Sequence, residues 1–104
     1  MIIDHRTYVI QHGRTGEYFK LFQAEGLPVQ LKHLGNLIGF FQTAVGPLNQ
    51  IVHLWGYEDF ADMERRRAAR DADPAWAAYK KKSAGLLLTQ ENKILRPVDF
   101  SPIK

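Results

Sequence analysis

The sequence contains no cysteine, which excludes disulfide scaffolds, zinc ribbons, cysteine-ligated iron–sulfur clusters and thiolate catalysis. It has no apolar run near the roughly 18 residues that a membrane-spanning helix needs. Its first six residues, MIIDHR, carry charge and lack an apolar core segment, so we expect neither a signal nor a transit peptide. We therefore expect a cytoplasmic protein without a membrane span.

The chain has 104 residues, of which 45% are hydrophobic, so a single globular domain over 1–104 is expected. Its net charge of +3 raises the question of a nucleic-acid partner. However, many basic residues fall in two short blocks, 65–70 and 80–82, within segments that read as amphipathic helices. No aromatic residues alternate with them as stacking platforms would. We expect solvated helix faces and no nucleic-acid binding.

Periodicity and turn residues predict the order strand, helix, strand, strand, helix, strand. The predicted strands cover residues 2–11, 37–43, 50–57 and 89–96. The first helical region begins near Thr15, is closed by Gly26 and is followed by a short helix over 27–34. Asp59 and Asp73-Pro74 mark the starts of two further helices. Two split β-α-β halves of this kind are typical of a ferredoxin-like α+β sandwich.

Alternation along the strands divides their residues between two faces. We predict that Val52 and Leu54 face the helices and that His53, Trp55 and Tyr57 lie on the opposite, open face. In the first strand the same reasoning places Ile3, Thr7 and Val9 toward the helices, and Asp4, Arg6 and Tyr8 on the open face. An open face carrying Trp, Tyr and Ile51 is too apolar to remain in water, so we expect a homodimer closed through these faces.

Several stretches resemble the NIPSNAP family. The most specific are 46–55 (GPLNQIVHLW) and 90–97 (QENKILRP), supported by RTY at 6–8 and by segments 26–35, 64–68 and 73–76. The resemblance implies a dimeric α+β barrel. Animal members of the family are linked to mitochondria, protein contacts and vesicle traffic, whereas families of the same architecture include cofactor-free monooxygenases, isomerases and haem-degrading enzymes.

The candidate catalytic residues are His53, Arg6 and Tyr8. His53 lies in the middle of a strand, where a neutral imidazole facing a cavity could act as general base or haem ligand, or could simply be hydrogen-bonded in the core. Arg6 could orient a ligand together with Tyr8, or form a structural ion pair with Asp4 or Glu91. The candidate ligand-binding residues are Trp55, Tyr57, Asn49 and Glu91, although Asn49 could serve only the turn.

No metal site is expected, because none of the four histidines has a metal-ligand spacing. No cofactor is expected either. Two hypotheses remain: a binder or enzyme acting on a small apolar molecule in the barrel cavity, or a non-catalytic module for protein–protein interaction.

Overall fold

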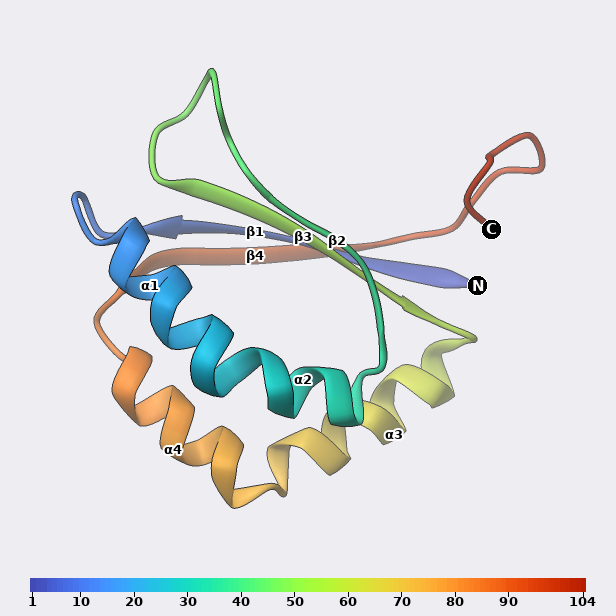
Figure 1. Ribbon diagram of the computed structural model, residues 1–104. Coiled ribbons are helices and arrows are strands. Elements are labelled where there is room, and N and C mark those ends of the chain that lie inside the picture. The colour runs from blue at the N-terminus through green and yellow to red at the C-terminus, as the bar shows by residue number, and fades with distance from the viewer.

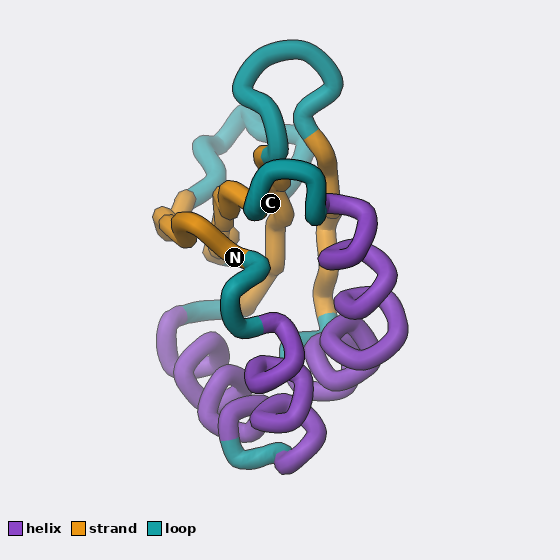
Figure 2. Tube along the Cα trace, turned by 90° about the vertical axis from the view of Figure 1, so that its left-hand side faces the viewer, coloured by secondary structure: helices purple, strands orange, loops and turns teal.

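The computed structural model describes all 104 residues and contains one four-stranded antiparallel sheet. The strands are β1 (Ile2–Ile10), β2 (Asn36–Gln42), β3 (Gln50–Tyr57) and β4 (Leu87–Leu95), in the spatial order β2-β3-β1-β4. The helices are α1 (Thr15–Leu21), η1 (Phe22–Gly26), α2 (Leu27–His33), α3 (Phe60–Asp71) and α4 (Pro74–Ser83). All of them cover the same face of the sheet (Figures 1 and 2). The predicted ferredoxin-like α+β fold is confirmed.

The predicted end of the first helix at Gly26 is wrong. Segment η1 is a π-helical stretch that joins α1 to α2 without a break, and Gly26 keeps right-handed helical geometry at φ −82°. A Cβ atom on Gly26 would lie 2.8 Å from the rings of both Phe22 and Tyr79. Glycine is therefore needed here for the close approach of α4 to η1. The chain instead leaves helical geometry at Gly35, where φ is +82°.

The helix starts predicted at Asp59 and Asp73 are confirmed. The Asp59 side chain accepts a hydrogen bond from the backbone N–H of Asp62, and Asp73 accepts one from the N–H of Ala75. These bonds satisfy N–H groups that a helix start leaves unpaired. None of the helices is long and apolar enough to cross a membrane.

The predicted assignment of the two sheet faces is reversed in the structure. Ile51, His53, Trp55 and Tyr57 of β3 lie beneath the helices, each with 3% exposure or less. In β1 one alternating set consists of buried Ile2, Asp4, Tyr8 and Ile10 together with Arg6. Ile3, from the other set, is also buried at the start of the strand. The helical layer supplies the apolar partners of this face in two clusters. Tyr18, Phe22 and Tyr79 pack with Tyr8, Ile10 and Ile51, and Leu34 and Met63 pack with Trp55 and Tyr57.

The open face therefore carries the other alternating set. Val52 and Leu54 lie on it, and Phe41, which pairs with Val52 in the sheet register, is 55% exposed. The β2–β3 loop and the C-terminal segment both extend away from the helices on this side of the sheet (Figure 1). Val45 and Leu48 in the loop and Phe100 in the C-terminal segment are among the most exposed apolar residues. The open face remains apolar, but through residues other than those expected.

Candidate functional site

A cavity of about 310 Å³ lies between the sheet and the helices. Its lining includes aromatic side chains from β1, α1, η1 and α4: Tyr8, Tyr18, Phe22, Trp76 and Tyr79. Polar groups enter the lining from α2 and β3 through Gln30 and His53, and from the end of α4 through Lys80 and Ser83. The cavity belongs to one chain and does not require the open face of the sheet. It unites two of the residues predicted from the sequence, Tyr8 and His53.

His53 is held by ring contacts on several sides and is 1% exposed. The ring of Phe40 stacks on it at 4.6 Å, and the ring of Tyr8 meets it edge to face at 4.8 Å between centroids. The indole Nε1 of Trp55 donates a hydrogen bond of 2.8 Å to His53 Nδ1, whereas Nε2 has no partner in the protein. Burial, followed by the charge of Arg6, lowers the pKa of His53 from 6.5 to about 3. The imidazole is therefore neutral at physiological pH.

Arg6 forms the structural ion pair that was one of the two interpretations from the sequence. Its Nη1 lies 2.9 Å from Asp4 Oδ2, and Asn92 donates to the other carboxylate oxygen of Asp4. Burial opposes the charge of Arg6, but Tyr8 and Asp4 together raise its pKa. Arg6 Nε also donates to the Tyr8 hydroxyl at 2.9 Å. Arg6 does not line the cavity and instead fixes the Tyr8 side chain that does.

Gln30 is a site residue that the sequence reasoning missed. It lies on α2 with 4% exposure, and its Oε1 has no hydrogen-bond partner in the protein. A signal was present, because Gln30 falls between Leu27 and Leu34 at helical spacing and so interrupts a buried apolar stripe with an amide. Tyr18 and Tyr79 also line the cavity. Burial, with Tyr79 beside it, raises the pKa of Tyr18 well above its ordinary value, so its hydroxyl stays protonated.

The other predicted ligand-binding residues lie outside this cavity. Trp55 contacts it only through His53. Asn49 has a positive φ of 61° in the β2–β3 turn, and its side-chain oxygen accepts a hydrogen bond from Thr15. Glu91 pairs with Thr7 in the sheet register and lines a small polar hollow with His5 and Lys93. It forms no ion pair with Arg6, which binds Asp4 instead. The structure assigns Asn49 to the turn.

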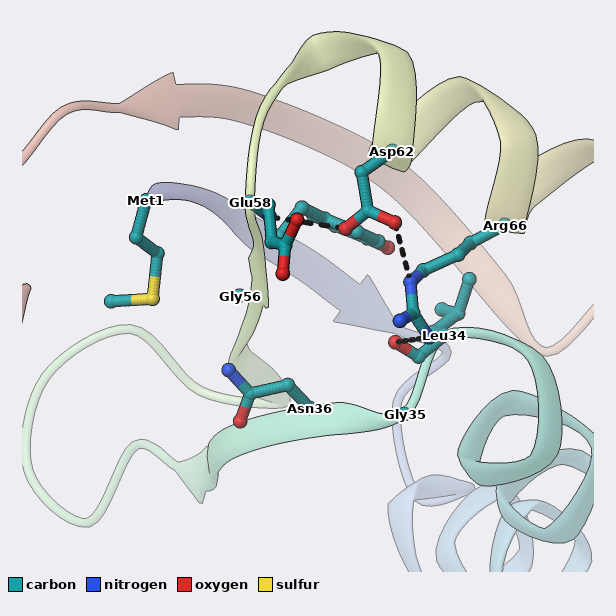
Figure 3. Close-up of a pocket in the computed structure, with 9 residues that line it drawn as sticks. Met1, Leu34, Gly35, Asn36, Gly56, Glu58, Asp62 and Arg66 are labelled. Atoms are coloured by element: carbon teal, nitrogen blue, oxygen red, sulfur yellow. Dashed lines mark hydrogen bonds and ion pairs between the residues drawn. The ribbon is translucent and has the colours of Figure 1, made fainter.

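A second, more open hollow of about 560 Å³ lies at the other end of the sheet (Figure 3). Tyr57 belongs to its lining. Its hydroxyl is buried without a partner, and burial, followed by the charge of Asp4, raises its pKa to about 12. Two of the charged side chains in this hollow, Asp62 and Arg66, already bind one another. Asp62 accepts from Arg66 Nε at 2.8 Å and from the backbone N–H of Glu58 at 3.0 Å.

Arg66 also donates, at 3.4 Å, to the carbonyls of His33 and Leu34 at the end of α2. This cluster ties α3 to the end of α2, and its carboxylate and guanidinium have little capacity left for a ligand. The smaller cavity is therefore the better candidate site. No group of three or more His, Asp and Glu side chains is placed to hold a metal ion.

The strand order, the one-sided helical layer and the cavity between them define a ferredoxin-like α+β protein with an internal pocket. A putative antibiotic biosynthesis monooxygenase from Nitrosomonas europaea has this fold at 12% sequence identity, with a TM-score of 0.68 over 94% of this chain and 99% of that one. At this identity the likeness concerns the fold alone.

The NIPSNAP family model matches residues 3–102, and the chain belongs to the NIPSNAP family. It is 34% identical over 93 residues to a NipSnap homologue of Dictyostelium discoideum, a match that covers 89% of this chain and 41% of that protein. The chain therefore spans less than half of that relative. A NIPSNAP family protein from Agrobacterium tumefaciens has a solved structure that matches with a TM-score of 0.96 at 43% identity, over 99% of this chain and 98% of that one.

Proposed function

We propose that this chain binds a small, largely aromatic molecule in the cavity between its sheet and its helices. One observation carries the proposal: two buried polar atoms without partners, His53 Nε2 and Gln30 Oε1, belong to residues that line the same cavity. Leaving a buried polar atom unpaired costs about 1 to 3 kcal/mol. A ligand that pairs with both atoms would remove this cost. His53 and Tyr8 are the polar groups that would face such a ligand, whether it is only bound or also transformed.

The size and lining of the cavity narrow the kind of ligand. A volume of about 310 Å³ is at the lower end of small-molecule sites, which suits one or two rings better than a porphyrin. The aromatic walls formed by Tyr8, Phe22, Trp76 and Tyr79 favour a flat ligand. Both features support an apolar, aromatic molecule.

Gln30→Leu tests this proposal, because it removes the unpaired amide oxygen at nearly constant volume. The wild type should bind members of a library of small aromatic compounds, detected by ligand-observed NMR. Gln30→Leu should weaken this binding and raise the free energy of unfolding by about 1 kcal/mol. The matched control is Gln23→Leu on the exposed side of η1, where both quantities should stay near wild type. Absence of any binding to the wild type, or unchanged binding in Gln30→Leu, would contradict the proposal.

A second candidate function, protein–protein association, is favoured by the uncovered sheet face. This face carries the apolar side chains of Phe41, Val52 and Leu54. Such a face is costly to expose to water. We infer that a second copy of the chain covers it and forms a dimeric α+β barrel, and that docking of another partner is the alternative.

Sedimentation should show the wild type at twice the chain mass of 11.9 kDa. Leu54→Glu places a charge in the centre of the proposed interface and should shift the population toward monomer at micromolar concentration. Ala78→Glu on the exposed side of α4 is the control and should leave the dimer intact. A wild type that sediments as a monomer would leave partner docking as the use of this face.

A further inference from the structure

The hydrogen bond between Trp55 and His53 determines which nitrogen of the His53 ring carries the proton. An indole N–H can only donate, so His53 Nδ1, at 2.8 Å, must be the acceptor. A neutral imidazole has one donor nitrogen and one acceptor nitrogen. The hydrogen is therefore on Nε2, the ring atom that has no partner in the protein.

Tyr8 provides a second donor beside His53. Its hydroxyl oxygen accepts a hydrogen bond from Arg6 Nε at 2.9 Å, which leaves the hydroxyl hydrogen free to be donated. The Tyr8 and His53 rings are in edge-to-face contact, and both line the cavity. Gln30 Oε1 is an unpaired acceptor in the same lining. Side chains that line the cavity thus carry N–H and O–H donors together with a carbonyl acceptor.

We infer that Trp55 is a positioning residue that keeps His53 as an N–H donor, and that the ligand is an aromatic carbonyl compound bearing a hydroxyl group. The carbonyl oxygen accepts from His53, and the hydroxyl donates to Gln30. This inference rests on the proposed small-molecule binding for its ligand, whereas the protonation of His53 is a property of the free protein. It also assigns His53 a role opposite to the general base or haem ligand considered from the sequence, since both need a lone pair on Nε2.

The first experiment measures the His53 tautomer without any ligand. In NMR spectra of protein with isotope-labelled histidine, the protonated ring nitrogen resonates well upfield of the unprotonated one, and His53→Gln identifies the His53 signals. The wild type should show the proton on Nε2. Trp55→Phe, which keeps an aromatic ring but has no N–H, should shift the two nitrogens toward a tautomer mixture, whereas Trp76→Phe should leave them unchanged. A proton on Nδ1 in the wild type, or an unchanged spectrum in Trp55→Phe, would overturn the role of Trp55.

The second experiment compares three probes of nearly equal shape: hydroxytetralone, tetralone and the hydrocarbon tetralin. In the wild type, tetralone should bind about tenfold more tightly than tetralin, and hydroxytetralone more tightly again, as expected for hydrogen bonds to buried partners. The ratio of the tetralone affinity to the tetralin affinity should fall toward one in Trp55→Phe and His53→Phe. Trp76→Phe should change both affinities together and keep the ratio.

The possible outcomes separate this inference from the proposed function. If tetralin binds as well as tetralone, the cavity binds small molecules but His53 is not its donor, and the inference fails alone. If no probe of the series binds while other aromatic compounds do, the assigned ligand class is wrong. If no aromatic compound binds at all, the proposed function fails, whereas the tautomer measurement still decides the role of Trp55.

Discussion

Trp55→Ala should lower the free energy of unfolding by about 3 to 5 kcal/mol, the range for truncating a large buried aromatic residue. Trp55 is 1% exposed and packs in one cluster with Ile2, Leu34, Tyr57 and Met63. The substitution leaves a cavity and also removes the N–H donor to His53. Urea denaturation at constant pH measures the effect, with Trp55→Phe as a milder variant that keeps most of the volume. A loss below about 1 kcal/mol would place Trp55 at an exposed position and contradict the face assignment.

Subunit association distinguishes the observed location of Trp55 from the location expected from the sequence. A residue on the open face would contribute to the dimer interface, so its truncation would weaken association. Since Trp55 lies beneath the helices, Trp55→Ala should sediment like the wild type under conditions where both are folded. Leu54→Glu, one residue away and on the other face, should show the opposite behaviour.

Acidification should destabilise the wild type more than a variant that lacks His53. The pKa of His53 is about 3 in the folded chain, below its ordinary value of 6.5, because the buried imidazole resists protonation. Between these two pH values His53 is protonated in the unfolded chain but not in the folded one. Its contribution to the free energy of unfolding is therefore fully present above about pH 6.5 and decreases as the pH falls toward 3. One pKa unit corresponds to about 1.4 kcal/mol, so the wild type should lose about 3 kcal/mol by pH 4 from this group.

The comparison requires His53→Gln, which has no titrating group at this position, and His12→Gln, which changes an exposed histidine. Carboxylates such as Asp62 and Asp73, whose pKa values are also lowered, contribute equally to all three proteins. The slope of unfolding free energy against pH should be shallower only in His53→Gln. Equal slopes in the three proteins would mean that His53 protonates in the folded state as readily as in the unfolded chain.

The elements and their order were predictable because their signals are local. The β3 strand has the predicted bounds, and Asp59 and Asp73 cap their helices as expected. The β4 strand begins at Leu87, two residues before the predicted start, and its register with β1 is irregular at Val9 and Ile10. Strand pairing in that region depends on the neighbouring strand, which a local pattern does not contain.

The buried face could not be chosen from alternation alone, since both faces of β3 are apolar. Val52 and Leu54 were predicted to face the helices, but His53, Trp55 and Tyr57 are the buried set. Trp55 and Tyr57 pack there with Leu34 and Met63. In β1 the charges of Asp4 and Arg6 argued against burial, yet they neutralise each other at 2.9 Å. Buried Ile2 and Ile10 were the better indicators.

The candidate site was predictable only in part. Tyr8 and His53 were selected because polar groups in the middle of strands stand out, and they do share one cavity. Gln30 and Tyr79 join them in the cavity lining. Helical spacing places Gln30 in a buried stripe, but it does not indicate which strand residues this stripe meets. The close contact at Gly26 belongs to the same packing. Sites that form between helices and a sheet are therefore harder to predict from local sequence patterns than the elements themselves.

Alternation in β1 and β3 has a consequence for how proteins of this kind can diverge. Tyr8 and His53 face the cavity, while their immediate neighbours Val9 and Val52 face the other side of the sheet. Under the proposed ligand binding and self-association, successive positions of one strand would be under two different selective pressures. Point substitutions would then change ligand preference without disturbing assembly, or assembly without disturbing ligand preference, so the two properties would evolve in separate steps.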